Sequence, residues 1–279
     1  NYNNGAMELQ MGNKDAALNY FQTALTMAEA LGEEGAEVAT NCKNAIPVLM
    51  VSIAKDLIKA ENFDGAIEQL NKAIEVAESY GNADAAEDAK TLVPQVLMSK
   101  AGDMLNAKNF AGAAETYQQV VAADTTNGMA ALRLGMALGA LGKNAEAENA
   151  YLLAARHGQE KNAMKQLSST YVKQAAAFLK VKKYQEAVDA ALKSNEYQEN
   201  ATAMKVAGTA ASALQKNEEA IQYLEKYLEL SPNAKDAAQM KYTIAATAQV
   251  LGDKEKAKAY YEQILSDPKF GPTAKQQLE

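Results

Sequence analysis

The chain contains one histidine and one cysteine, the two side chains most often used as general base and nucleophile. His157 lies in "AARHGQEK", directly before Gly158, where a helix is expected to end. A positive charge at that end is favoured by the helix dipole. A single histidine also leaves a catalytic triad or a dedicated zinc site without enough partners. We interpret His157 as a helix-end residue.

Cys42 admits two interpretations, a packed thiol or a reactive one. It falls on an apolar stripe with Val38, Ile46 and Leu49. A reactive thiol needs an exposed, electropositive setting, whereas an apolar stripe faces the core. The pattern therefore favours a packed thiol, and a lone cysteine excludes an internal disulfide.

Neither the carboxylates nor the glycines indicate a catalytic or phosphate-binding site. The Asp and Glu residues fall on the polar faces of expected helices, and none is set in apolar surroundings that would raise its pKa. The glycines of "LGMALGALGK" lie within a helix pair that no strand precedes, so they do not form a phosphate-binding loop. The sequence predicts no enzyme, no cofactor and no metal site.

Composition and charge narrow the class of protein further. Of the 279 residues, 48% are hydrophobic and none is Trp, and no apolar run approaches the roughly 18 residues of a membrane span. The net charge is −7, and residues 1–100 alone carry 7 Lys against 15 Asp or Glu. Such a chain repels nucleic-acid backbones and anionic membrane surfaces. We expect an ordered, all-helical chain that binds no nucleic acid.

The first residue is Asn, and no charged and apolar export segment precedes it. We therefore expect a trimmed chain. Together with repeats that are rich in Ala and contain Asn and Gln, this favours an exported protein, in the periplasm or at the cell surface, over a cytoplasmic one.

A repeated motif organises the chain. The segment "AENFDGAIEQLNKAI" (60–74) returns as "AKNFAGAAETYQQVV" (107–121), at an offset of 47 residues. The core of the pattern is an Ala followed four residues later by a large side chain and three later by a small or apolar one. Seven copies follow this pattern, with spacings of 49, 47, 34, 40, 33 and 37, and the fifth has the small Ala191 in place of the large side chain. The anchoring alanines are Ala17, Ala66, Ala113, Ala147, Ala187, Ala220 and Ala257.

Each copy predicts a pair of antiparallel helices. Apolar residues recur at intervals of three and four, the period of a helix that lies on a core. The polar turn between the two helices, such as "AENFDG", is too short for any other connection. In the fourth copy we expect Gly135 and Ala147 to lie where the two helices cross, since larger side chains would hold them apart.

The first two copies are longer than the others. Their second helices are predicted to end at left-handed caps, Gly32 and Gly81. The next helices are predicted to run from about 34 to 60 through Pro47, and from about 83 to 107 through Pro94, with kinks at the prolines. At the other end, Pro272 is positioned to open a short terminal helix.

These residues carry a resemblance to the tetratricopeptide repeat, whose pattern is W-x2-L-G-x2-Y…A-x3-F…P. The fourth copy matches with Leu134, Gly135, Leu138, Ala147 and Tyr151. The sixth copy matches with Gly208, Ala220, Leu224 and Pro232. The family Trp is missing throughout, the fifth copy has Ala191 in place of the aromatic, and only the sixth has the proline in register.

The resemblance implies an all-α fold, a right-handed α-α superhelix of about seven helix pairs. It would form one domain over residues 1–279, closed by a capping helix at 272–279. The long N-terminal repeats are similar to those of kinesin-light-chain-type scaffolds. The expected repeats span 1–32, 34–81, 83–126, 128–158, 161–199, 201–232 and 234–268.

The resemblance also implies a function, since the first helix of each pair lines an inner groove in this family. We expect a bacterial protein-interaction scaffold that binds a protein or peptide partner in that groove, in an oligomeric state that the sequence leaves open. The inner wall would contain Val51, Gln95, Met98, Leu132, Met136, Val172, Lys205 and Tyr242. Core packing is the other explanation for the apolar members. The Lys and Asn clamp that holds a terminal carboxylate in some relatives is not matched.

One stretch stands apart in charge. Residues 161–183 contain six lysines and no acid, and we expect Lys173 and Lys180 to meet an acidic flank of the partner. A solvated helix face is the simpler explanation. Another is that the lysines meet the acidic first third of a neighbouring molecule of this chain.

A second hypothesis for the function is a cell-envelope assembly or carbohydrate-capture component, in which the repeats frame a ligand site. Paired aromatic side chains at the mouth of the groove would favour it. Only Tyr242 is expected at a position that fits such a pair.

Overall fold

A computed structural model describes all residues from 1 to 279, which form fifteen α-helices and no strand. They divide into two compact units, Asn1–Leu141 and Gly142–Glu279, called unit 1 and unit 2 below. The expectation of a single domain stays a prediction. Unit 1 contains α1 (Tyr2–Gln10), α2 (Lys14–Ala30), α3 (Ala36–Lys59), α4 (Phe63–Tyr80), α5 (Ala83–Asn106), α6 (Phe110–Ala123) and α7 (Gly128–Ala140).

Unit 2 begins with α8, and a break at His157 and Gly158 separates α8 from α9. A short terminal helix that Pro272 opens, α15, packs on α14, as the sequence predicts. Its helices are α8 (Asn144–Ala154), α9 (Glu160–Lys180), α10 (Tyr184–Tyr197), α11 (Ala201–Ala213), α12 (Asn217–Leu230), α13 (Ala237–Val250), α14 (Lys254–Glu262) and α15 (Gly271–Leu278).

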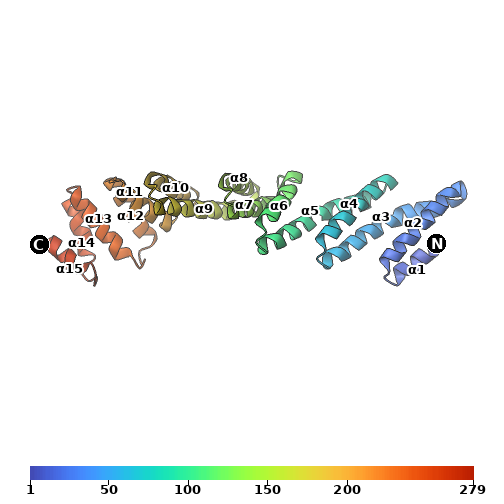
Figure 1. Ribbon diagram of the computed structural model, residues 1–279, viewed down its shortest axis with the longest axis horizontal. Coiled ribbons are helices and arrows are strands. Elements are labelled where there is room, and N and C mark those ends of the chain that lie inside the picture. The colour runs from blue at the N-terminus through green and yellow to red at the C-terminus, as the bar shows by residue number, and fades with distance from the viewer. The chain divides into compact units, whose positions relative to one another are not determined.

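Within each unit, every helix packs against the helix before it and the helix after it, and consecutive helices alternate in direction (Figure 1). The predicted all-α fold of antiparallel pairs is confirmed. The seven repeated alanines are the centre of this packing, because six of them have no exposed surface and Ala257 is only 5% exposed. A side chain of one methyl group allows two helix backbones to approach closely.

The sixth copy shows why the glycine of the repeat pattern must lack a side chain. A Cβ atom added to Gly208 of α11 would lie 2.6 Å from Cδ2 of Leu224 on α12. Leu224 is itself buried, with 2% exposure, so it has little room to move aside. The tetratricopeptide pattern residues of this copy therefore meet where α11 and α12 cross.

The long helices are also confirmed. Helix α3 continues through Pro47 and α5 continues through Pro94. Gly81 ends α4 in the left-handed conformation, with φ of 72°, and Gly32 has φ of 60° directly after α2. Between α2 and α3 the chain adds one 3-10 turn, Gly32–Gly35.

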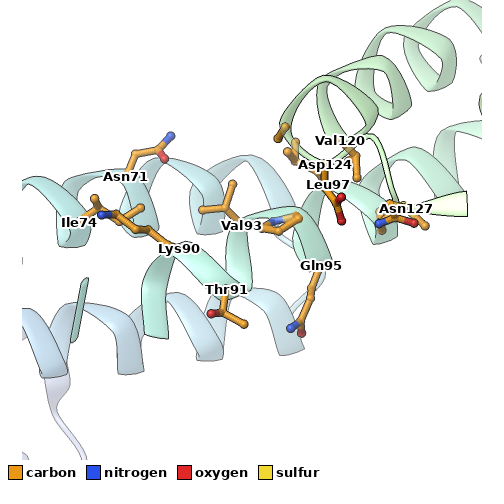
Figure 2. Close-up of a pocket in the computed structure, with 13 residues that line it drawn as sticks. Asn71, Ile74, Lys90, Thr91, Val93, Gln95, Leu97, Val120, Asp124 and Asn127 are labelled. Carbon is orange, nitrogen blue, oxygen red and sulfur yellow. The ribbon is translucent and has the colours of Figure 1, made fainter. Parts of the chain in front are cut away.

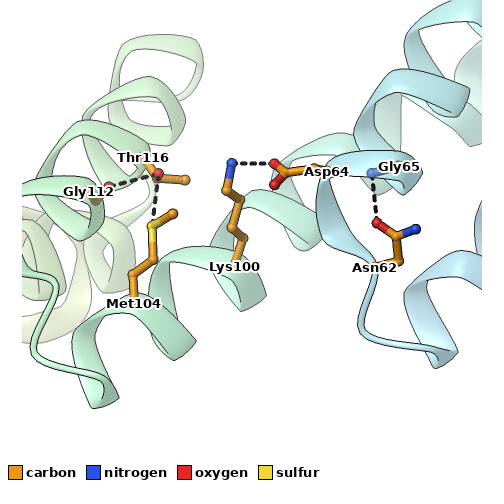
Figure 3. A network of polar contacts seen from close by, with 7 residues as sticks. All are labelled: Asn62, Asp64, Gly65, Lys100, Met104, Gly112 and Thr116. Carbon is orange, nitrogen blue, oxygen red and sulfur yellow. Dashed lines mark hydrogen bonds and ion pairs between the residues drawn. The ribbon is translucent and has the colours of Figure 1, made fainter.

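The turn inside every helix pair has one residue with positive φ. These seven residues are Gly12, Glu61, Lys108, Gly142, Lys182, Gln215 and Gly252. In the second and third copies the next residue is an asparagine that caps the following helix, as when Asn62 accepts a hydrogen bond from the backbone N–H of Gly65 at 3.1 Å (Figure 3). The neighbouring Asp64 on α4 forms an ion pair of 2.5 Å with Lys100 on α5. The same turn geometry thus recurs with different residues.

Four of these turns hold a non-glycine residue in a conformation that costs roughly 1–2 kcal/mol. Lys108 has φ of 61° and forms no ion pair. We expect Lys108→Gly to raise the free energy of unfolding by about 0.5–1 kcal/mol, after the greater flexibility of glycine in the unfolded chain is subtracted. Urea denaturation would measure it. The control is Ala107→Gly, where φ is −74° and glycine should destabilise by a similar amount. Equal loss of stability in both variants would contradict the argument.

Candidate interaction surfaces

The third helix pair leaves part of its first helix uncovered. Helix α5 has 24 residues, as α3 does, but its partner α6 has 14 residues where α4 has 18. Four residues correspond to about one turn, or 6 Å. Helix α6 stops early because Asp124 takes an extended conformation and accepts hydrogen bonds from the backbone and side chain of Thr126. The middle of α5 therefore faces an open space.

This space is a groove of about 580 Å³ in unit 1, called the α5 groove below. Side chains of α4 form one end, and the end of α6 with the start of α7 forms the other (Figure 2). Its apolar lining is mostly half-buried. The lining residues are Asn71, Ile74, Lys90, Thr91, Val93, Pro94, Gln95, Leu97, Met98, Val120, Ala123, Asp124 and Asn127.

Pro94 gives the α5 groove a polar feature in its apolar wall. Proline has no N–H, so the carbonyl of Lys90, four residues earlier, receives no helical hydrogen bond from position 94. The Lys90 side chain is held at one end by an ion pair of 2.6 Å with Glu78. The groove thus combines apolar contact area with a lysine that is ion-paired to Glu78.

The predicted groove residues of unit 1 differ in exposure, and only some of them line the α5 groove. Met98 and Gln95 line the α5 groove. Met136 on α7 is 39% exposed, so it is a surface residue. Leu132 on the same helix is only 7% exposed and Val51 on α3 only 2%. These last two contribute to packing much more than to a surface.

In unit 2, Val172, Lys173 and Lys180 lie on α9, with both lysines exposed. Lys205 is not a free cation: it forms an ion pair with Asp236, and its Nζ lies 5.9 Å from the centre of the Tyr227 ring. Asp236 also accepts a hydrogen bond of 2.5 Å from Tyr227. The nearby Lys205 cation and the Tyr227 hydroxyl lower the pKa of Asp236.

Tyr242 packs against other aromatic side chains. Its ring stacks on Phe270 at 5.2 Å between ring centres and meets Tyr261 edge-on at 6.0 Å. Tyr242 is half-buried. This cluster joins α13 and α14 to the segment before α15.

Glu148 is the centre of a polar cluster that sequence reasoning missed. It accepts hydrogen bonds from Tyr171 at 2.5 Å and Tyr197 at 2.7 Å, and forms an ion pair of 2.9 Å with Lys193. The two rings stack at 5.8 Å, and Lys193 lies 4.5 Å from the centre of the Tyr171 ring. The cluster ties α8, α9 and α10 together. The partners are 23 to 49 residues apart in sequence, so no local pattern signals it.

The pKa values in this cluster follow from its contacts. Burial raises the pKa of Glu148, but hydrogen bonds from Tyr171, Lys193 and Tyr197 together outweigh it and lower the pKa below its ordinary value. Burial and the hydrogen bond to Glu148 raise the pKa of Tyr197 to about 12. At neutral pH the carboxylate is therefore charged and the phenols are protonated.

The single cysteine and the single histidine both occupy positions that suit a structural role. Cys42 has no exposed surface, and burial raises the pKa of its thiol. His157 is half-buried at the break that ends α8, before Gly158 with φ of 82°. The chain holds no group of three or more His, Cys, Asp or Glu side chains placed to bind a metal ion. None of its helices is long and apolar enough to cross a membrane.

The Glu148 cluster gives a stability prediction. Glu148→Ala leaves two tyrosine hydroxyls and Lys193 without their acceptor and should lower the free energy of unfolding by about 1–3 kcal/mol. Glu146→Ala is the matched control on the same helix, because Glu146 is exposed and forms only a 3.6 Å ion pair with Lys143. That change should stay within about 0.5 kcal/mol. Urea denaturation of both variants tests this, and equal effects would refute a structural role for the cluster.

The same cluster predicts a pH dependence. Since folding lowers the pKa of Glu148 from an ordinary 4.5, its stabilisation is present above that pH and is lost as pH falls through the folded-state value. The difference in stability between wild type and Glu148→Gln should therefore narrow below about pH 4.5. Denaturation curves at several pH values would show it. A constant difference down to pH 3 would contradict it.

Comparison with known proteins agrees with the fold. Two family models, both described as tetratricopeptide repeat, match residues 103–163 with 172–235, and residues 238–266. No curated protein matches the chain. A solved fragment of MamA from Desulfovibrio magneticus RS-1 is 14% identical, with 62% of this chain and 93% of that one covered and a TM-score of 0.37.

Two further solved structures are similar to a comparable degree. A MamA structure labelled AMB-1 is 23% identical, with 62% of this chain and 90% of that one covered and a TM-score of 0.40. YrrB, described as a TPR protein with an unusual peptide-binding site, is 17% identical, with 65% and 91% covered and a TM-score of 0.36. Because the family models together match more than half of the sequence, and the matched residues fold as helix pairs, this chain belongs to the tetratricopeptide repeat family.

Proposed function

We propose that the chain is a non-enzymatic scaffold that binds an apolar segment of a partner protein in the α5 groove. Its membership of the tetratricopeptide repeat family supports a role in protein interaction. The observation that carries the proposal is the missing turn of α6, which leaves half-buried apolar side chains of α5 without a covering helix.

The lining of the groove indicates the kind of segment that fits. Ile74, Val93, Leu97 and Met98 offer apolar contacts, and methionine adapts to side chains of different shapes. The carbonyl of Lys90 accepts a hydrogen bond from the segment, which an extended backbone can donate more readily than a helical one. We therefore infer an extended segment with two or three apolar side chains.

The alternative of a carbohydrate-capture component has less support. Sugar rings stack on exposed aromatic faces, but the aromatic pairs of unit 2 stack on each other, Tyr171 on Tyr197 and Tyr242 on Phe270. The hydroxyls of the first pair are also bound to Glu148. In each of these two pairs, one face of each ring is therefore covered by its partner.

Site-specific photo-cross-linking in intact cells captures the bound segment directly. A photoreactive residue at Gln95 lies in the groove, and one at Gln118, exposed on α6 outside the lining, serves as the matched control. The segment attached only to position 95 is mapped and then synthesised for titration. If both positions label the same segment, or if the segment has no apolar residues, the proposal fails.

Titration of the mapped segment tests the role of Met98. Met98→Glu should weaken binding by about tenfold or more, because a charge replaces an apolar contact in the groove. Met129→Glu is the matched control, since Met129 is 39% exposed on α7 and lies outside the lining. Melting temperatures of both variants show whether folding is retained. Unchanged affinity in a folded Met98→Glu variant would overturn the proposal.

The sequence predicts a longer groove that includes Met136 on α7. This extension remains a proposal. Met136 is 39% exposed, so Met136→Glu should leave the melting temperature nearly unchanged. We expect it to weaken binding only if the partner segment continues along α7. The same titration series decides this.

A further inference from the structure

Helix α9 presents a row of lysines to solvent, called the α9 stripe below. It consists of Lys161, Lys165, Lys173 and Lys180, all of which are exposed. At 100° per residue these four positions fall within about one third of the helix circumference, on the side away from the buried Ala163 and Leu167. The row extends over about 28 Å.

None of these four lysines forms an ion pair. Other lysines, such as Lys108, Lys235 and Lys254, also form none, but these four lie together on one face of one helix. All seven lysines of residues 1–100 are paired with a carboxylate. In unit 2, Lys193, Lys205 and Lys226 are also paired. No acid lies on α9 beyond Glu160, so the fold does not use the charge of the stripe.

The stripe also has an apolar edge. Val172 and Leu179 lie along one side of it and are half-buried against the core of unit 2. Between the lysines, Ser169 and Ala176 have short side chains, so another chain can approach the helix closely. A surface with a cationic row, a flat centre and an apolar border fits an amphipathic acidic segment.

We propose that the α9 stripe is a docking surface for an acidic polypeptide segment of a partner protein, with carboxylates on the lysines and apolar side chains on Val172 and Leu179. Charge complementarity is the argument for this occupant, because the lysines have no partner within the chain. The inference does not rest on the α5 groove, which lies in unit 1 and is tested by different variants.

A nucleic acid is the other polyanion that such a row attracts, and the surroundings disfavour it. Proteins that bind single strands combine cations with aromatic side chains on which bases stack. The aromatic residues of α9, Tyr171 and Phe178, pack against the core of unit 2, and Tyr171 is held by Tyr197 and Glu148. The net charge of −7 further repels an extended phosphate backbone.

The test uses the full chain and a labelled synthetic peptide of about 20 residues, long enough to span the stripe as a helix. The peptide is amphipathic and rich in Glu, and a second peptide has Gln at every Glu position. Fluorescence anisotropy at about 50 and 300 mM salt measures affinity, with single-stranded oligothymidine as a third probe. We expect the Glu peptide to bind, to weaken with salt, and to bind at least about tenfold more tightly than the Gln peptide.

Matched variants locate the site. Changing Lys161, Lys165, Lys173 and Lys180 together to Glu should weaken binding of the Glu peptide by about tenfold or more. The control changes Lys108, Lys235, Lys254 and Lys275 to Glu, four exposed lysines without ion pairs that give the same change in net charge. The control should lose no more than about threefold. Lys→Gln versions of both sets serve if charge reversal impairs folding.

Three outcomes would overturn the proposal. The first is that the Glu peptide fails to bind, or that the Gln peptide binds equally well. The second is that the stripe variant and the control lose the same affinity, because binding would then follow net charge alone. The third is that oligothymidine binds more tightly than the Glu peptide, since the stripe would then be a nucleic-acid surface.

Discussion

The structure depends on how closely the two helices of each pair approach one another. At the crossing of α11 and α12 even one added carbon on Gly208 would overlap Leu224, and the seven repeated alanines are almost completely buried. Burial of such small side chains gives little hydrophobic free energy per residue. One pair therefore cannot fold alone, and each unit gains its stability because every pair covers the next.

This constraint also determines where the chain can vary. The turn is the same in every copy, with a left-handed residue that is glycine in three turns and a charged or amide residue in four. Helix length is free to change, because the ends of the helices lie beyond the crossing. The α5 groove is such a change: α6 keeps its buried Ala113 and its capping Asn109, and only its last turn is absent. A binding surface thus forms without loss of packing.

The sequence predicted the parts of the fold that local spacing controls. The alanine anchors, the helices through Pro47 and Pro94 and the left-handed Gly81 all follow from residues within a few turns of one another. The sites were harder to predict, because they depend on contacts between distant residues. The assignment of Lys205 to a groove stays a prediction, and its ion pair with Asp236, 31 residues later, was not predicted. For the α5 groove a local signal existed in "DTTNG", where Asp124 ends α6. That signal predicts the end of α6, but the groove is recognised only when the length of α6 is compared with that of α4.

The two units differ in their balance of charged residues and in how many lysines form ion pairs. Residues 1–141 contain 9 Lys or Arg and 18 Asp or Glu, so acids are in excess and each lysine of residues 1–100 finds a partner. Residues 142–279 contain 19 and 17, and there some lysines remain unpaired. Exposed ion pairs stabilise a fold little, so an unpaired lysine costs the protein almost nothing. A row of unpaired lysines on one helix face can therefore persist without a structural role, and it stays available to carboxylates that another protein provides.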